Sequence, residues 1–481
     1  MELAAILIIP IVASGLSLAP IGRRFAAPLT AAATAIILAL AAMVAIETTG
    51  AGRIDALGGV LTCDGLGALI LALVALVGFT AALFSWGYIA KRAQAGGGHN
   101  VQRYYGLYNL FVLSMLAVPV LANVALMWIA VELTTLLSAF LVGFEDTAEA
   151  LEAAWKYVVL TTLGAVIALL GFLILYWGSR VAGYEPFTWV GLVDAAPHMP
   201  PALLWPAFLF ILVGFGTKVG LVPLHTWLPD AHSQAPAPIC ALLSGVETTT
   251  VLYVILRLFP VIGVAPGLDA RPWFIGFGLV SVGIAALLLV QVRDFKRMFA
   301  YSTVEHMGII LVAAGLGGVD AHLGAAYQMT GHALAKSFCF FAAGMIVMAV
   351  GTQEIASVRG LIRSSPVAAL ALLAGGFAIA GAPPFAIFVS EIVILKAGVA
   401  SGQYVSVALL AFFVVVAFCA IMFHINRMVF GLPSSESAAF STPLACKATL
   451  AFAAIPLLVI GVYVPGPLQR LLTAAAAAMG G

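Results

Sequence analysis

Long apolar segments recur along almost the whole chain, and they constrain its fold more than any other feature. A helix needs about 20 mostly apolar residues to cross the hydrocarbon core of a bilayer. Fourteen segments of the 481-residue sequence approach or exceed this length. Membrane β-barrels instead show short alternating segments, so the continuous runs predict an all-α polytopic membrane protein. The predicted spans are residues 3–20, 27–46, 66–90, 105–122, 123–144, 153–178, 203–225, 236–259, 272–291, 299–317, 321–350, 366–398, 404–430 and 447–464.

The composition supports a membrane protein and excludes several other classes. Only 9% of the residues are charged, whereas soluble domains have about 25%. A net charge of +1 leaves no basic surface for nucleic acid, and 63% hydrophobic residues exclude disorder. The cysteines occur singly, so no iron–sulfur or zinc cluster is expected, and we predict neither a cofactor nor a metal. These cysteines are Cys63, Cys240, Cys339, Cys419 and Cys446.

The distribution of lysine and arginine predicts the orientation. The N-terminus enters an apolar run without a basic leader, so it is expected to be a first span and not a cleaved signal. Segments after spans one, three, five, nine, eleven and thirteen carry thirteen of the 21 cations, and those on the other side carry five. Cytoplasmic loops of membrane proteins are enriched in these residues. Both termini are therefore predicted on the outer, periplasmic side of a bacterial inner membrane.

Seven charged residues lie within the apolar runs, where each costs about 2.5–3.5 kcal/mol if it is isolated in lipid. We expect them to face the interior of the helix bundle, where they pair or line water. Static salt bridges between helices are one interpretation, and a path for protons or other ions is the other. The seven residues are Glu132, Lys218, Glu247, Glu305, Lys336, Glu391 and Lys396.

Prolines next to two of these charges predict breaks in spans seven and twelve. Pro223 follows Lys218 by five residues, and Pro383 and Pro384 precede Glu391. Proline removes a backbone donor and clashes with the preceding turn of a helix. Two broken helices at corresponding places in two halves are typical of transporters with inverted repeats.

Histidines add groups that titrate near neutral pH. His332 and Lys336 are four residues apart and so share a helix face, and His306 lies on the tenth span. His225 and His232 are expected to shape the broken seventh helix or a cytoplasmic proton entrance. An intramembrane metalloenzyme is an alternative for these two, but their spacing of seven is not that of a metal motif.

Five ordered motifs combine these charges, prolines and histidines. They are WIAVELTTLLSAFLVG (128–143), KVGLVPLHTWLPDAHSQAP (218–236), RDFKRMFAYSTVEHMG (293–308), GHALAKSFCFFAAG (331–344) and AGAPPFAIFVSE (380–391). The five motifs resemble the antiporter-like subunits of respiratory complex I, of multisubunit sodium/proton antiporters and of membrane-bound nickel–iron hydrogenases. The segment EALEAAWKYVVL (149–160) is most similar to hydrogenase-4 component F and its formate hydrogenlyase relatives.

This resemblance implies inverted repeats made of spans four to eight and nine to thirteen. The implied regions are 1–104 with the first three helices, 105–260 and 261–430 with one repeat each, and 431–481 with helix 14 and a tail. In the family pattern Glu132 matches a glutamate that pairs with Lys218. The usual basic residue of span eight falls on or near Thr249, so the connection runs through Glu247 or through water held by neighbouring threonines.

The predicted proton pathway combines the buried charges with the residues carried over from the resemblance. It consists of Glu132, Lys218, Glu247, His306, His332, Lys336 and Glu391. The accessory candidates are His225, His232, Glu305, Lys396 and Thr249.

The resemblance implies a proton-translocating, non-catalytic subunit of a redox-driven complex of the membrane-bound hydrogenase or NADH:quinone oxidoreductase type. Its expected partners are other membrane subunits, a peripheral redox arm and lipids. Uphill transport costs about 2.3 kcal/mol per charge per 100 mV, and the sequence contains no GxxxxGK[ST] nucleotide loop. The energy must therefore come from partner chains. A subunit of a multisubunit Na⁺/H⁺ antiporter is the alternative.

Overall fold

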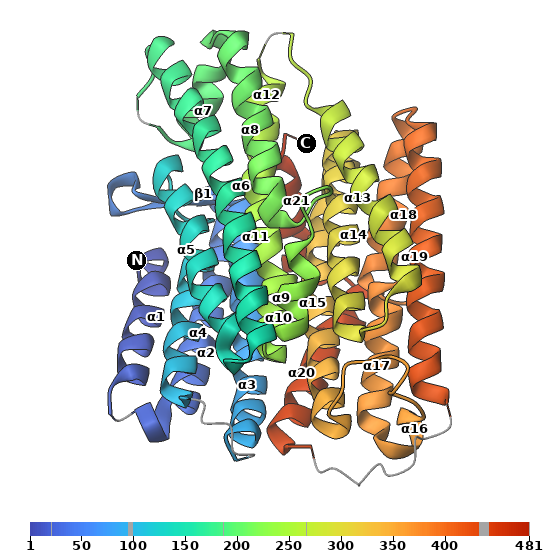
Figure 1. Cartoon of the computed structure of the whole chain (residues 1–481). Helices are drawn as coiled ribbons and strands as arrows, with labels where there is room; N and C mark the ends of the chain where they lie inside the picture. Colours follow the sequence, from blue (N-terminus) through green and yellow to red (C-terminus); the bar gives the residue numbers. More distant parts are fainter. Residues whose placement is uncertain (21, 95–99, 186, 266, 432–441, 481) are drawn as a thin grey trace.

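The computed structural model describes residues 1–20, 22–94, 100–185, 187–265, 267–431 and 442–480. Most of these residues form helices that run side by side along the height of the molecule (Figure 1). Eleven of the described helices are long and apolar enough to cross a membrane. The other predicted spans correspond to shorter elements, and the count of fourteen stays a prediction. The shorter elements are α1 (Glu2–Leu18), α4 (Val101–Ala117), and α17 (Pro366–Ile379) with α18 (Ala386–Ala400).

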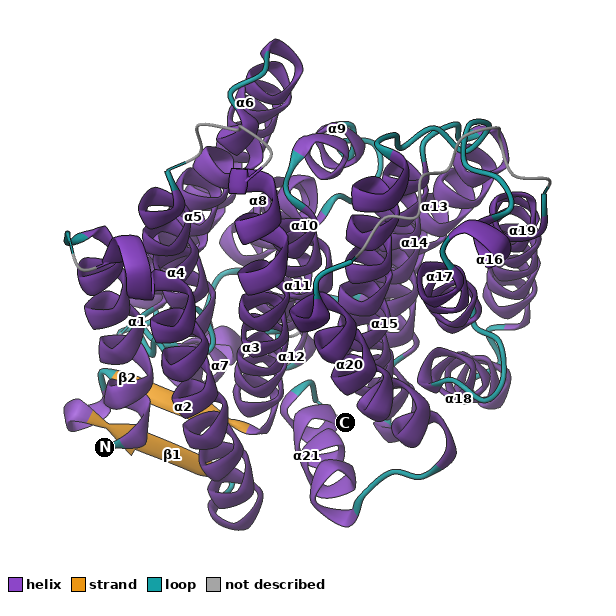
Figure 2. Cartoon of the chain, turned by 90° about the horizontal axis from the view of Figure 1, so that it is seen from below, coloured by secondary structure: helices purple, strands orange, loops and turns teal. Residues whose placement is uncertain are grey.

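The N-terminal helices include a hairpin that the hydropathy pattern did not predict. Between α2 (Gly22–Ala51) and α3 (Gly65–Gln94), strands β1 (Arg53–Ala56) and β2 (Leu61–Asp64) pair antiparallel (Figure 2). Each strand has four residues and lacks an apolar run, so only the loop between two spans was visible in the sequence. The fold remains otherwise helical, as predicted.

The next helices build the first half of the polar interior. Side chains of Asn123 and Thr147 accept hydrogen bonds from the first free backbone amides of α5 and α6, and so define where these helices begin. The elements are α5 (Val124–Val142), α6 (Ala148–Val181), α7 (Trp189–Ala195), α8 (Pro201–Val219), α9 (Trp227–Gln234), α10 (Ala237–Leu242), the π-helical segment η4 (Leu243–Glu247), α11 (Thr248–Leu256) and α12 (Leu258–Gly263).

Both predicted helix breaks are present. Helix α8 ends directly after Lys218, where Gly220 adopts a left-handed conformation with φ of +86°, and α9 begins seven residues later at Trp227. Helix α17 ends at Ile379, and α18 begins at Ala386 after the two prolines. In each case the break lies beside a buried charged residue, as the proline positions predicted.

The remaining helices form the second half and the C-terminal region. They are α13 (Arg271–Gln291), α14 (Phe295–Leu316), α15 (Val319–Val350), α16 (Leu361–Ser364), α19 (Tyr404–Phe430), α20 (Leu444–Val462) and α21 (Gly466–Ala478). Helix α21 corresponds to the predicted tail and packs against α3 and α15. Residues 432–441 and 481 of the predicted region 431–481 lie outside the described residues.

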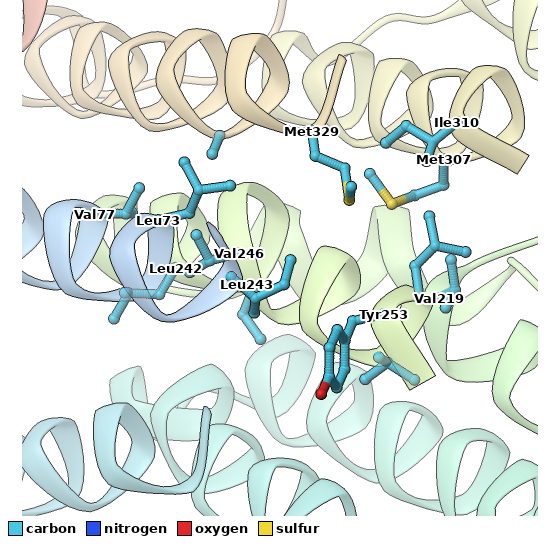
Figure 3. Packing of buried hydrophobic residues seen from close by; sticks show 14 of the residues in the cluster. Leu73, Val77, Val219, Leu242, Leu243, Val246, Tyr253, Met307, Ile310 and Met329 are labelled. Atoms are coloured by element: carbon cyan, nitrogen blue, oxygen red, sulfur yellow. The ribbon is translucent and has the colours of Figure 1, made fainter. Parts of the chain in front are cut away.

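A few helices are surrounded by protein while others form the periphery. The most apolar stretch of Ala237–Gly263, which spans α10 to α12, is 100% buried and that of α14 is 94% buried, against 28% for α19. Figure 3 shows part of the packing between these central helices, with Leu243 and Val246 of η4 and Met307 of α14. The central helices therefore bring polar residues into an interior that is otherwise tightly packed and apolar.

Candidate functional site

The first polar cluster is centred on the carboxylate of Glu247, at the end of η4. Its Oε1 lies 3.2 Å from Nζ of Lys218 and accepts hydrogen bonds from Thr134 (2.9 Å) and Tyr157 (3.0 Å). Lys218 also donates to the hydroxyl of Thr135. Both charged side chains are almost fully buried. A buried pair is stabilised by hydrogen bonds to its remaining donors and acceptors, and α5 and α6 supply these to Lys218 and to Oε1 of Glu247, whereas Oε2 of Glu247 has no partner among the described residues.

Glu132 does not form the predicted pair with Lys218, so that part of the interpretation was wrong. Its Oε1 accepts a hydrogen bond of 2.6 Å from Thr162 on α6, and its Oε2 has no partner among the described residues. The ammonium group of Lys218 instead lies at Thr135, one helical turn further along α5. The ionic partner of Lys218 is instead Glu247, because η4 places the carboxylate of Glu247 facing α8.

The π-helical segment η4 also connects the two halves. The carbonyl oxygen of Ser244 lies 2.9 Å from Nε2 of His332 on α15. The hydroxyl of Ser244 lies 2.6 Å from the hydroxyl of Thr303 on α14. Thr249, the accessory candidate on this span, is buried, and its hydroxyl points back to the carbonyl of Gly245 at 3.5 Å. The connection through Glu247 and the one through water held by neighbouring threonines both stay predictions. Isolated π-helical turns inside α-helices are frequent at functional sites.

The second cluster lies between α14 and α15. The rings of His306 and His332 are 5.2 Å apart, and both residues are completely buried. Lys336 is also buried, on the same face of α15 as His332, and donates to the carbonyl of Phe299 (2.8 Å) and to the hydroxyl of Ser302. The predicted shared face is therefore confirmed. Glu305 is buried within electrostatic range of Lys336, and its Oε2 has no hydrogen-bond partner among the described side chains and backbone groups.

Two polar residues of this region were missed in the sequence. The amide nitrogen of Gln328 lies 3.2 Å from Nδ1 of His306, and the amide oxygen accepts a hydrogen bond from Ser390 on α18. A signal was available, because Gln328 precedes His332 by four residues and Lys336 by eight. Spacings of four place all three on one face of a helix. The amide carries no charge, so it does not stand out in an apolar run as an ionised side chain does.

Glu391 and Lys396 lie in different surroundings, and the expectation that all seven charges face the interior is wrong for Lys396. Glu391 is 8% exposed and faces the break between α17 and α18, next to Gly381. It also lies within electrostatic range of Glu305. Lys396 is exposed on the outer side of α18. The carboxylate therefore belongs to the interior, and the lysine does not.

The two histidines near the first break do not form a cluster. His232 is completely buried and stacks on Phe340 with ring centroids 5.2 Å apart, and neither ring nitrogen has a described hydrogen-bond partner. His225 is only partly buried, in the segment between α8 and α9. Among the described residues, no group of three or more His, Cys, Asp or Glu side chains is arranged to hold a metal ion.

A charged surface group lies close to His232 in the chain. Asp230, in the first turn of α9, binds Arg297 at 2.7 Å and Lys156 at 3.4 Å. Lys296 is buried and donates to the carbonyls of Ser233 and Ala235. These contacts join α6, α9 and α14 near the buried His232.

The fold and the interior together define a polytopic integral membrane protein with ionisable side chains in both halves. A family model described as "NADH:quinone oxidoreductase/Mrp antiporter, TM" matches residues 122–418. The chain belongs to this family. The matched segment contains every residue of the predicted pathway, from Glu132 to Glu391.

Individual relatives agree with the predicted resemblance. A hydrogenase-4 component F homolog from Methylacidiphilum infernorum is 38% identical over 420 residues, which cover 85% of this chain and 87% of the relative. Hydrogenase-4 component B from Escherichia coli is 31% identical, and the match covers 69% of this chain and 50% of that protein. NADH-quinone oxidoreductase subunit N from Halorhodospira halophila is 28% identical over 92% of this chain and 90% of its own length.

Two solved structures share the fold. One is the membrane-bound sulfane sulfur reductase, an archaeal respiratory membrane complex, with a TM-score of 0.88, 24% identity, and coverage of 100% of this chain and 98% of the other. The other is the Mrp complex from Dietzia sp. DQ12-45-1b, with a TM-score of 0.88, 19% identity, and coverage of 99% and 97%. The predicted fold class and the predicted family are thus confirmed.

Proposed function

We propose that the chain moves protons along its buried polar residues as a membrane subunit of a redox-driven complex. The observation that carries this proposal is the series of buried ionisable groups that runs from Lys218 and Glu247 through η4 to the His332 and Lys336 cluster. Isolated charges in lipid are costly, and ionisable residues inside membrane proteins typically mark ion or proton paths. The pathway comprises Glu132, Lys218, Glu247, His306, His332, Lys336 and Glu391.

The Lys218–Glu247 pair is the element that can be switched. A nearby opposite charge favours the charged form of each partner, and its loss disfavours it. Nζ of Lys218 lies 3.2 Å from Oε1 of Glu247, so the two charges compensate each other. If the pair separates, the desolvated ammonium releases a proton toward the His332 cluster.

The energy source is a reaction on partner chains. Relatives are named as subunits of hydrogenase-4, of NADH-quinone oxidoreductase and of antiporter complexes. By analogy we assign this chain to a complex of the membrane-bound hydrogenase or NADH:quinone oxidoreductase type, with further membrane subunits and a peripheral redox arm. Apolar side chains exposed on α6 and α19, such as Leu163 (58%) and Phe412 (60%), offer faces for lipid or for these subunits.

The orientation and the internal repeats are part of the same proposal. The excess of lysine and arginine on one side assigns both termini to the outer face of a bacterial inner membrane. The proposed inverted repeats are residues 105–260, which contain α5 to α11, and residues 261–430, which contain α13 to α19. A broken helix beside a buried charge in each of these segments supports this assignment.

The proposal is tested by Glu247→Gln in the complex purified in mild detergent and reconstituted into vesicles. Removing one partner of a buried ion pair leaves an uncompensated charge and costs about 3–5 kcal/mol. We expect proton uptake per transferred electron to fall at least about tenfold. Glu132→Gln, which removes no ion pair, should have a smaller effect. Glu152→Gln is the control, because Glu152 is 63% exposed.

An unchanged proton-to-electron ratio in an assembled Glu247→Gln complex would contradict the proposal. Copurifying proteins provide a second test, since the proposal requires a redox-active chain among them. The alternative, a subunit of a Na⁺/H⁺ antiporter, has support from the fold shared with the Mrp complex. It predicts Na⁺-dependent proton movement without electron transfer, which ceases when choline replaces Na⁺.

A further inference from the structure

The hydrogen bonds of His306 determine which ring nitrogen carries hydrogen. Nε2 lies 3.0 Å from the carbonyl oxygen of Ile379, which can only accept, so Nε2 is protonated. Nδ1 lies 3.2 Å from the amide nitrogen of Gln328, which can only donate, so Nδ1 presents a lone pair. His306 is therefore a neutral imidazole, and it cannot take a second proton while the amide of Gln328 keeps this orientation.

The neighbouring histidine lacks this restriction. Nε2 of His332 lies 2.9 Å from the carbonyl of Ser244, and its Nδ1 has no hydrogen-bond partner among the described residues. His332 can accept a proton on Nδ1 without any rearrangement of a neighbour. His306 needs one, and the group that must rearrange is Gln328.

Ser390 allows a second arrangement of the same groups. Its hydroxyl contacts the amide oxygen of Gln328 and lies 2.8 Å from the carbonyl oxygen of Ile387. A hydroxyl has one hydrogen and two lone pairs. It can donate to Gln328, or it can donate to Ile387 and accept a hydrogen bond from the Gln328 amide nitrogen. Both acceptors are already within reach, so no helix has to move.

We propose that the side-chain amide of Gln328 rotates, so that its oxygen and nitrogen exchange places, when His306 binds a proton at Nδ1. This reversal changes the hydrogen bond of Gln328 to Ser390, beside Glu391 on α18, in response to protonation of His306 on α14. In the protonated state the amide oxygen accepts from Nδ1–H, and the amide nitrogen donates to Ser390. Gln328 is thus a positioning residue, and the proton itself stays on the imidazole. This inference rests on the proposed function, because it assigns Gln328 to the same pathway.

The charges around His306 determine whether its protonation, and with it the reversal of Gln328, is favoured or opposed. His332 and Lys336 face it from α15, Glu305 is its neighbour on α14, and Glu391 lies on α18 next to Ser390. Helix α17 contributes the carbonyl of Ile379. A cation on Lys336 or His332 opposes protonation of His306, whereas a negative charge on Glu305 or Glu391 would favour it. The reversal of Gln328 therefore responds to charges on α15 and on α18, the helices that carry Lys336 and Glu391.

The reversal is tested by nitrogen-15 NMR of the full chain, labelled at histidine, in lipid bilayers. His306→Phe identifies the signals of His306. At neutral pH we expect the Nε2–H tautomer in the unmodified chain. Gln328→Met removes both polar atoms, so Nε2–H should stay on the carbonyl of Ile379 while the Nδ1 signal shifts because Nδ1 has lost its hydrogen bond. Gln328→Glu presents only acceptors and should convert His306 to imidazolium at the same pH. Unchanged His306 signals in both variants would overturn the proposal.

A transport measurement separates this proposal from the proposed function. In the assembled complex, Gln328→Met and Ser390→Ala should each lower proton uptake per electron by about tenfold, the factor that one hydrogen bond to a charged group supplies. Gln403→Met, at an exposed position, is the matched control. If the NMR signals shift as expected but neither the Gln328 and Ser390 variants nor Glu247→Gln alters transport, the reversal of Gln328 is supported and the proposed function is contradicted. Normal transport in both variants while Glu247→Gln blocks it would refute the role of Gln328.

Discussion

At position 381, the absence of a side chain leaves room for the carboxylate of Glu391. Gly381 lies in the break between α17 and α18 with φ of +71°. A Cβ atom added there would overlap Oε2 of Glu391 and lie 3.0 Å from its Cδ. Distances this short force the carboxylate to move. Gly381 therefore has two functions, since it permits the left-handed turn and it shapes the space around a buried acid.

We predict that Gly381→Ala lowers proton uptake several-fold by displacing Glu391. The positive φ adds strain of about 1–2 kcal/mol for any residue with a Cβ. Gly402→Ala is the control, because Gly402 has φ of +75° but no atoms within 4 Å of an added Cβ. Both variants should lose similar thermal stability, and only Gly381→Ala should lose transport. Equal transport in the two variants would show that the position of Glu391 is unimportant.

Among single residues, the sequence identified the buried charges but not all of their contacts. Glu247, Lys336 and Glu391 were recognised because a charge in an apolar run is costly wherever it lies. The partner of Lys218 was assigned to Glu132 because hydropathy and motifs contain no information on side-chain direction. Gln328 was overlooked because an amide contributes little to a search for charges, although its contacts to His306 and Ser390 are as specific as an ion pair.

At the scale of elements, the two kinds of helix irregularity differ in how well a sequence predicts them. Proline removes a donor and clashes with the preceding turn, so both breaks could be located from Pro223 and Pro383–Pro384. The π-helical segment η4 has no proline and differs from an α-helix by its i→i+5 hydrogen bonds. Its residues have no distinctive composition. Its existence depends on packing against α15, which the sequence does not display.

Gly245 is the residue through which η4 approaches α15. An added Cβ would lie 3.3 Å from the carbonyl oxygen of Ala333. We predict that Gly245→Val separates η4 from α15, weakens the bond between Ser244 and His332, and lowers proton uptake about tenfold while the Lys218–Glu247 pair persists. Gly263→Val, at the open end of α12, should leave transport unchanged. A Gly245→Val complex with full transport would exclude η4 as the connection.

For the whole molecule, hydropathy predicted the helical class and most spans, because the cost of exposing backbone groups to lipid acts on every segment alike. The hairpin and α21 were not predicted. Helix α21 is short and rich in alanine, and it is ordered through Leu471, Leu472 and Ala475, which are buried against other helices. Such elements depend on long-range packing, and no local pattern identifies them.

One long-range ion pair ties the N-terminal helices to the central ones. Arg257, at the end of α11, binds both carboxylate oxygens of Asp64 in β2, across 193 positions of the chain, and stacks on Tyr253 at 4.8 Å. Burial acts to raise the pKa of Asp64, but the charge and the hydrogen bonds of Arg257, with backbone amides of Leu66 and Gly67, outweigh it and hold this pKa below its usual value.

We predict that Asp64→Asn destabilises the chain by about 2–3 kcal/mol, less than the 3–5 kcal/mol of a fully buried pair because Asp64 is partly exposed. A carboxylate with a lowered folded-state pKa contributes stability above its unfolded pKa of about 4, and loses it as the pH falls through the folded value. The unfolding temperature of the unmodified chain in detergent should therefore drop below about pH 4, and that of Asp64→Asn should drop less. Asp55→Asn is the control, since its pair with Arg53 is half-exposed and worth at most about 1 kcal/mol. Parallel acid dependence in the unmodified chain and in Asp64→Asn would show that this pair does not hold the two parts of the molecule together.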